Sequence, residues 1–380
     1  MRLTVALYNF RDGGPRRNGS YDFAALPRAF ADVADPPALI MLCEAKGYAD
    51  HGKAGLLGAA AALSEELNRP YAGELGWCDR GPFGPAIFYD PNALRLQSWW
   101  DPSSPGAADD KRNLARFRAR DSGVEILALV QHWDFRSGTR RRQEAGVIDR
   151  YGEHDLPVIV GGDLNATASG PHLPQRDWHA AGHRARAQKG RELPDGSWVA
   201  DADAVDHLIG RWDPKLERHV GGCGFAAVAE LAAKSGTPLV EAYRPTVNDG
   251  VDAGGGLLID WLLANPAMAT RFIPHSYRVH LSPEGSDPPS DHRLVTAAFD
   301  LTLHSTGTCL SGRESLRRRR REGAAVSVSE EISFRADLIP EQDAHALAAR
   351  AVPTLSPPRA AGEPARRPWR ALEVARKGDP

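Results

Sequence analysis

The chain has 380 residues, of which 42% are hydrophobic and 25% are charged, and its formal net charge is -2. No stretch approaches the ~20 consecutive apolar residues of a membrane span, and the four cysteines lie far apart without a CxxC pair, which argues against a zinc knuckle or a disulfide framework. This composition suits one large globular domain or two smaller ones, and it predicts no polyanion partner by itself, although a local basic groove is compatible with it.

Strand-like runs recur through the first three hundred residues. The apolar run at the start is broken by Tyr8 and Asn9 and is too short for a signal peptide, so we expect a soluble, cytoplasmic protein. The runs cover 3–10, 38–45, 84–90, 124–133, 156–164, 257–265 and 292–303, and helical stretches cover 54–68, 140–154 and 224–236. Mixed strands and helices predict a layered α/β architecture.

Two segments differ from this pattern. Residues 171–222 are rich in Gly, Asp, His and Trp, and their three tryptophans are too many for a linker, so we expect a folded insertion. Residues 304–380 are rich in Arg and Pro, with about 14 basic and about 10 acidic residues, and we expect a disordered tail. The run Arg317 to Arg321 in this tail is either a polyanion contact or a solvated charge run. Residues 1–303 would then form the folded domain.

Polar residues stand near the ends of successive strands, where a core strand should avoid them. They are Asn9, Glu44, His132, Asp163, Asn165, Asp260, Asp291 and His292. A single one could be a turn residue or a satisfied core polar group, and Gly-Gly-Asp-Leu-Asn alone could be only a turn, with glycines at positive φ. Because residues two apart in extended chain point to the same face, Asp163 and Asn165 would project together. Their recurrence predicts one cleft at a shared rim of the sheets.

This inventory suits the hydrolysis of a phosphate ester. Carboxylates and amides are hard oxygen ligands for Mg²⁺, a further carboxylate can act on water, and imidazoles can bond phosphoryl oxygens. The chain has no recognisable nucleophile elbow and no Walker lysine, so acyl transfer and nucleotide-loop chemistry are not indicated.

The ordered motifs "YNF", "LCEA", "VQHWD", "GGDLN", "LIDWLLA" and "SDHRLV" resemble those of the endonuclease/exonuclease/phosphatase superfamily, whose fold is shared by DNase I, apurinic endonucleases and inositol-polyphosphate 5-phosphatases. The resemblance covers about residues 1–303, and the long segment after GGDLN is not part of the family core. It implies a four-layered α/β sandwich with two packed mixed β-sheets flanked by helices.

The resemblance also implies roles for the strand-end residues. Glu44 corresponds to the principal Mg²⁺ ligand, with Mn²⁺ as a substitute metal, and Asn9 and Asp291 would lie near that ion. Asp163 would orient or deprotonate the attacking water, and Asn165 would bond a phosphate oxygen.

Two histidines complete the implied site. His292, oriented by Asp260, and His132 would stabilise the transition-state charge or protonate the leaving oxygen. In DNase-like members the equivalent of His132 has an acidic partner, for which Asp79 is a candidate unless it only caps a turn. Cys43 stands where many relatives have Gln.

The resemblance leaves the substrate open. Arg116, Arg118 and Arg120 alternate and could line one strand face beside Lys111 and Arg112, which would follow a DNA or RNA backbone, or they could protect an exposed edge strand. We place a nuclease or nucleic-acid phosphodiesterase first, an enzyme acting on a small phosphorylated molecule second, and a non-catalytic binding module third. We expect a monomer with no membrane partner.

Overall fold

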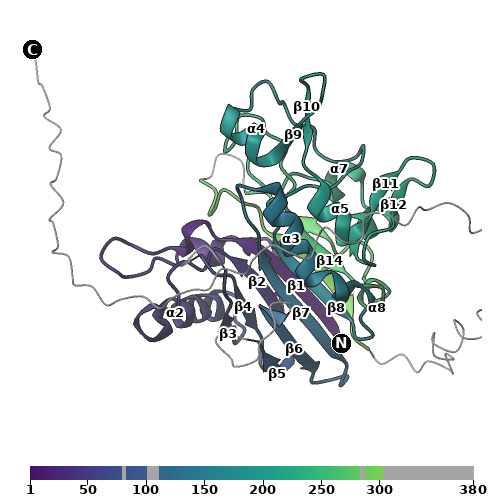
Figure 1. Ribbon diagram of the computed structural model, residues 1–380. Coiled ribbons are helices and arrows are strands. Elements are labelled where there is room, and N and C mark those ends of the chain that lie inside the picture. The colour runs from purple at the N-terminus through teal and green to yellow at the C-terminus, as the bar shows by residue number, and fades with distance from the viewer. Residues whose placement is uncertain (79–82, 101–110, 283–286, 303–380) are drawn as a thin grey trace, which may run out of the picture. The chain divides into compact units, whose positions relative to one another are not determined.

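The computed structural model describes residues 1–78, 83–100, 111–282 and 287–302. The predicted tail and Asp79 lie outside these residues. Two six-stranded sheets form the centre of the molecule (Figure 1). The first has the order β15 (Arg278–Val279), β16 (Val295–Asp300), β1 (Arg2–Asn9), β2 (Leu39–Cys43), β4 (Ala86–Tyr89), β3 (Ala72–Leu75). The second has the order β13 (Ala226–Ala227), β14 (Asp260–Ala264), β8 (Val158–Asp163), β7 (Glu125–His132), β6 (Leu114–Ala119), β5 (Leu94–Trp99).

Both sheets are mixed. Strands β1 and β2 pair in parallel, as do β7 and β8, whereas the other pairs of named strands are antiparallel. Strands β1 and β2 pack against β7, β8 and β14, so that the two sheets lie face to face. The parallel pairs sit at the centre of the molecule, where both faces of a strand are buried, and this explains their uninterrupted apolar sequences.

Alternation along β1 shows how the layers arise. Leu3, Val5 and Leu7 belong to the core between the sheets. Ala6 and Tyr8 belong to a second core that also contains residues of the helices α1 (Ala25–Arg28) and α2 (Asp50–Glu66). Successive strand residues point to opposite faces, so one strand contributes to both cores.

Helices also cover the outer face of the second sheet, and they are α3 (Gly138–Ile148), α6 (Val228–Lys234) and α8 (Pro266–Ala269). Figure 1 shows α2 beside β3 and β4 of the first sheet. Together the two helical layers and the two sheets form the four-layered α/β sandwich that the sequence predicts.

The segment 171–222 contains its own short elements, which gather above α3 in Figure 1. They are α4 (His183–Lys189), β9 (Gly190–Glu192), β10 (Trp198–Ala200), α5 (Asp203–Ile209), β11 (Arg211–Asp213) and β12 (Arg218–Val220). The buried Arg141 of α3 joins this segment to the body: its Nη2 donates to Asp201 Oδ2 at 2.8 Å and to the Gln188 carbonyl oxygen at 3.0 Å. Its Nη1 donates to the Asp134 carbonyl oxygen at 3.1 Å.

The remaining short helices are η1 (Arg11–Gly13), η3 (Asp149–Glu153) and α7 (Leu239–Ala242). Each of the seven predicted strand-like runs contains a strand. The helical stretch expected at 224–236 begins instead as β13, because Ala226 and Ala227 pair with β14 before α6 starts. Among the described residues, no helix has the length and apolar character needed to cross a membrane.

Candidate active site

The glycine pair before Asp163 belongs to the strand and forms no turn. Neither glycine has a positive φ. A Cβ at Gly161 would lie 2.3 Å from Met41 Sδ of the facing sheet, and one at Gly162 would lie 2.2 Å from the Gln131 carbonyl oxygen. The expected positive φ at the glycines is therefore wrong, although Asp163 does bond to the nearby Asn165 amide as a turn residue would. Glycine is needed at position 162 because the backbone of the neighbouring strand approaches β8 too closely for a side chain.

Strand register places three of the predicted residues in one row. His132 is the partner of Asp163 across the parallel pair β7 and β8, and Asp260 is its partner across the antiparallel pair β8 and β14. All three are buried. His132 Nε2 lies 3.7 Å from Asp163 Oδ2, and His132 Nδ1 lies 3.4 Å from the Phe83 carbonyl oxygen.

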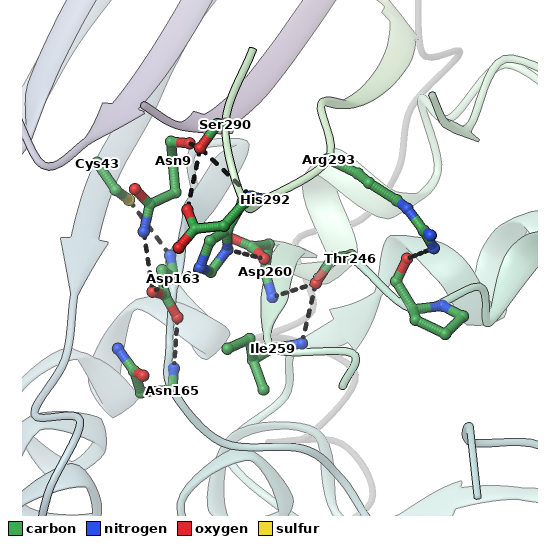
Figure 2. A network of polar contacts seen from close by, with 12 residues as sticks. Asn9, Cys43, Asp163, Asn165, Thr246, Ile259, Asp260, Ser290, His292 and Arg293 are labelled. Carbon is green, nitrogen blue, oxygen red and sulfur yellow. Dashed lines mark hydrogen bonds and ion pairs between the residues drawn. The ribbon is translucent and has the colours of Figure 1, made fainter. Parts of the chain in front are cut away.

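His292 reaches the same carboxylate from the loop before β16. Its Nδ1 lies 2.8 Å from Asp260 Oδ2, and its Nε2 lies 4.0 Å from Asp163 Oδ2, so Asp260 orients the ring toward Asp163 (Figure 2). The Thr246 hydroxyl accepts hydrogen bonds from the backbone amides of Ile259 and Asp260, both at 3.1 Å, and thereby fixes the start of β14.

The first sheet contributes Asn9, at the end of β1, and Glu44, directly after β2. Asn9 Nδ2 donates to Asp163 Oδ2 at 3.1 Å and lies 3.5 Å from Glu44 Oε1. Glu44 Oε2 accepts a hydrogen bond from the Asp12 amide at 2.8 Å, and Glu44 has a φ of 61°. A non-glycine residue in this left-handed conformation is strained, and such residues concentrate at functional sites.

Asp291 joins the cluster through a serine. The Ser290 hydroxyl lies 2.7 Å from the carbonyl oxygen of Asn9 and 3.2 Å from Asp291 Oδ1 (Figure 2). Arg11 Nε lies 3.8 Å from Asp291 Oδ2. Ser290 belongs to the motif that the sequence singled out, but its position between Asn9 and Asp291 is visible only in three dimensions.

Asn165 lies beside Asp163 in a left-handed conformation, with a φ of 51°. Its amide donates to Asp163 Oδ1 at 2.9 Å, and its Nδ2 donates to the Trp133 carbonyl oxygen at 3.2 Å. The Lys189 ammonium group donates to Asn165 Oδ1 and lies 3.3 Å from the Asn165 carbonyl oxygen. Lys189 is the last residue of α4, and no motif in the sequence indicated it.

Cys43 connects the two sheets beneath the site. Its thiol donates to the Gln131 carbonyl oxygen, and its sulfur accepts from the Asp163 amide, both at 3.3 Å. The residue that departs from the resembled pattern therefore holds the backbone of Asp163. Beyond the eight predicted residues, the cluster thus gains Cys43, Lys189, Thr246 and Ser290.

The charges of these groups are shifted by their surroundings. Burial alone would lower the pKa of His292, but the carboxylates of Asp260 and Asp163 raise it to about 10. Burial opposes ionisation of Asp163, yet the neighbouring His292, His132 and Lys189 hold its pKa below the ordinary value. Burial lowers the pKa of Lys189 to about 8. At neutral pH the site therefore contains an ionised Asp163 facing a protonated His292.

Two cavities open beside the cluster and share Asn165. One, of about 660 Å³, is lined by Glu44, Phe83, His132, Asp134, Phe135, Arg136, Arg140, Asp163, Asn165 and His292. The other, of about 590 Å³, is bounded largely by the 171–222 segment, including Trp178, Lys189, Arg191 and Trp198. Asn165 therefore lies between the two cavities.

The donor set fits a hard divalent cation. Asn9 Oδ1 is buried and has no hydrogen-bond partner among the described residues, so its lone pairs are available to a ligand that is not protein. Glu44 supplies a carboxylate beside it. Oxygen donors of this kind are preferred by Mg²⁺ and Mn²⁺.

No protein-family model and no curated protein matches the sequence. Solved structures similar to the chain include an endonuclease/exonuclease/phosphatase family protein from Bacteroides thetaiotaomicron, with 18% identity over 79% of this chain and 99% of that one and a TM-score of 0.45. They also include an AP endonuclease from Archaeoglobus fulgidus (16% identity, 79% and 100% covered, TM-score 0.43) and a mannosyl-6-phosphatase from Bacteroides thetaiotaomicron (18%, 78% and 98%, 0.44).

Proposed function

We propose that this chain is a metal-dependent phosphoesterase that uses an activated water molecule. One observation carries the proposal: the single oxygen Asp163 Oδ2 has an amide at 3.1 Å and two imidazole nitrogens at 3.7 and 4.0 Å, contributed by both sheets. If Asp163 formed only a structural ion pair, one partner for its carboxylate would be enough. Three convergent polar groups beside a cavity instead suit the binding of a water molecule and a phosphoryl group in line.

The residues divide the reaction between them. Asp163 holds the water and accepts its proton as the water oxygen bonds to phosphorus. His292, protonated and held by Asp260, donates a proton to the leaving oxygen as its bond to phosphorus breaks. Asn165 and His132 donate hydrogen bonds to the phosphoryl oxygens, where charge accumulates.

A divalent cation bound by Glu44 and Asn9, with Asp291 nearby, would supply charge neutralisation at the phosphoryl oxygens. Mg²⁺ is the first candidate and Mn²⁺ the second. Asn9 would then have two tasks, because its Oδ1 faces the cation while its Nδ2 restrains Asp163.

The position of the arginine row argues against its role in substrate binding. Arg118 is the register partner of Glu125 in β7, seven residues before His132, which corresponds to roughly 23 Å along the strand. Arg116 is paired with Glu125, and Arg120 donates to the Pro91 carbonyl oxygen at 2.6 Å. Strand β6 lies between β5 and β7, so the alternative of a charged edge strand is also wrong.

The cations that line the two cavities are better placed. Arg136 and Arg140 line the first, and Lys189 and Arg191 line the second. These groups border two neighbouring cavities that share Asn165, which favours a small phosphorylated molecule or the end of a nucleic-acid strand. Endonucleolytic action on a long duplex is the second candidate, because Arg140 is largely exposed at the mouth and available to a backbone.

The test compares bis(p-nitrophenyl) phosphate, p-nitrophenyl phosphate, single-stranded DNA, RNA and supercoiled plasmid, each with Mg²⁺, Mn²⁺ or EDTA. We expect hydrolysis of a small ester or shortening of strands from an end, with loss of activity in EDTA and in Asp163→Asn. Nicking of the plasmid would favour the second candidate. Activity that survives both EDTA and Asp163→Asn would refute the proposed function.

A further inference from the structure

A second group of side chains that could hold a metal ion lies outside the candidate active site. Asp149 begins η3, His207 belongs to α5, and Cys223 lies in the loop after β12. Their ligand atoms all lie within 4.8 Å of one another, and all three residues are partly exposed. The three share no local sequence motif, because 58 residues separate Asp149 from His207.

The arrangement of the three ligand atoms favours a cation site over a proton relay. His207 Nε2 lies 3.1 Å from Asp149 Oδ2 and 3.5 Å from Cys223 Sγ, whereas Nδ1 lies 3.9 Å from the same sulfur. In a cysteine–histidine–aspartate relay, the carboxylate and the thiol would contact different ring nitrogens. Here Nε2 is the ring nitrogen nearer to the sulfur and also contacts the carboxylate oxygen, and all three ligand atoms lie within 4.8 Å of one another, which is close enough for one ion to contact all three.

The separations also match the preferred geometry of zinc. With Zn–N of ~2.0–2.1 Å, Zn–S of ~2.3 Å and Zn–O of ~2.0–2.2 Å, a tetrahedral ion places nitrogen about 3.6 Å from sulfur and about 3.4 Å from oxygen. The observed 3.5 and 3.1 Å are close to these values.

The backbone holds Cys223 in place. Its amide donates to the Leu208 carbonyl oxygen at 3.0 Å, one residue after His207. A Cβ on Gly152 would lie 1.8 Å from the Cys223 carbonyl oxygen, so only glycine allows this approach between the loop and η3. Gly222 and Gly224, on either side of Cys223, have φ values of 71° and 91°. The backbone of Cys223 is therefore positioned by contacts to both segments that supply the other ligands.

We propose that Asp149, His207 and Cys223 bind one Zn²⁺ ion, with water as the fourth ligand, and that this ion fastens the 171–222 segment to the body. The thiolate makes the site selective for zinc over magnesium, because Mg²⁺ prefers oxygen ligands. The ion would be held by α5 and the Gly221–Gly224 loop on one side and by η3 on the other, and it would therefore link elements that the sequence places far apart.

The test uses the full chain with Mg²⁺ in excess, titrated with Zn²⁺ alone by calorimetry and with Co²⁺ alone by absorption spectroscopy. We expect one high-affinity site, a sulfur-to-cobalt charge-transfer band and a raised melting temperature with Zn²⁺. Cys223→Ser should abolish the band and weaken Zn²⁺ binding by on the order of 100-fold or more, and His207→Gln should also weaken it. Cys309→Ser serves as the matched thiol control and should change neither.

Two results would overturn the proposal. The first is the absence of a charge-transfer band in the wild-type chain at saturating Co²⁺. The second is a band that persists in Cys223→Ser, which would assign the sulfur ligand to another cysteine. Because binding and absorption are measured without a substrate, neither result depends on the proposed phosphoesterase activity.

Discussion

Replacing Asp163 with Asn removes one charge from the candidate site while keeping the size of the side chain. In the wild type, Oδ1 accepts from the Asn165 amide and Oδ2 accepts from Asn9 Nδ2. Asparagine has only one oxygen, so one of these two buried donors would face an NH₂ group. Leaving a buried donor unsatisfied costs about 1–3 kcal/mol of stability.

The expected effect on turnover is larger and has a different origin. Loss of the carboxylate that orients and deprotonates water should lower kcat by roughly 10²- to 10⁴-fold, which is about 3–5 kcal/mol in the activation barrier. The assay measures kcat on a small phosphodiester with saturating Mg²⁺, at a temperature where denaturant titration shows the variant to be folded.

Asp90→Asn provides a matched control. Asp90 is also buried, its Oδ1 accepts from the Asn92 amide at 2.7 Å, and its Oδ2 accepts from Arg69 Nε at 2.6 Å. The Asp90→Asn variant loses a carboxylate that accepts from a backbone amide, as Asp163→Asn does, and it also loses the ion pair with Arg69. Because Asp90 lines neither cavity, the change should cost stability but not kcat. Near wild-type turnover in folded Asp163→Asn would refute the reasoning, as would an equal loss of turnover in Asp90→Asn.

Three further predictions concern the metal, a lysine and the arginine row. Glu44→Gln should raise the Mg²⁺ concentration needed for half-maximal activity by about 10- to 100-fold, and an unchanged Mg²⁺ titration would remove Glu44 from the metal site. The pKa of Lys189 is about 8 in the folded chain against 10.5 ordinarily, so the unfolded chain binds more protons between these pH values. The free energy of unfolding of the wild type should therefore rise with pH over this range, by up to about 3 kcal/mol. Equilibrium unfolding of Lys189→Met should lack this rise, and parallel curves for the two proteins would contradict the burial of the ammonium group. Replacing Arg116, Arg118 and Arg120 together with Gln should leave KM for a small phosphodiester and the salt dependence of DNA cleavage unchanged, whereas a raised KM for DNA would return the row to the substrate-binding surface.

The sequence was sufficient to predict the central strands and the polar residues that cluster at their ends. Uninterrupted apolar runs predict strands buried on both faces, and this is why β1, β2, β7 and β8 could be placed from sequence within a few residues. Polar residues at the ends of such runs are costly unless they have a task, so their recurrence indicated a shared rim. The register rows and the Asn9 contact bring Asp163 together with residues from both sheets.

Contacts between distant segments could not be obtained in this way. The alternation of Arg116, Arg118 and Arg120 predicts a shared strand face. Only the pairing of β6 with β7 shows that Arg118 lies beside Glu125, at the end of β7 opposite to His132. The positive φ expected for Gly161 and Gly162 failed for the same reason, because the atoms nearest to a side chain there belong to the distant residues Met41 and Gln131.

Lys189 and the group formed by Asp149, His207 and Cys223 are the clearest cases. Each depends on how the 171–222 segment folds back on the body, and Arg141 and Asp201 illustrate the contacts that fix that path. Periodicity and residue type report the environment of a side chain over a few neighbours in the chain. Which side chains meet across 24 or 58 residues is instead set by the packing of whole elements, and only the tertiary structure decides it.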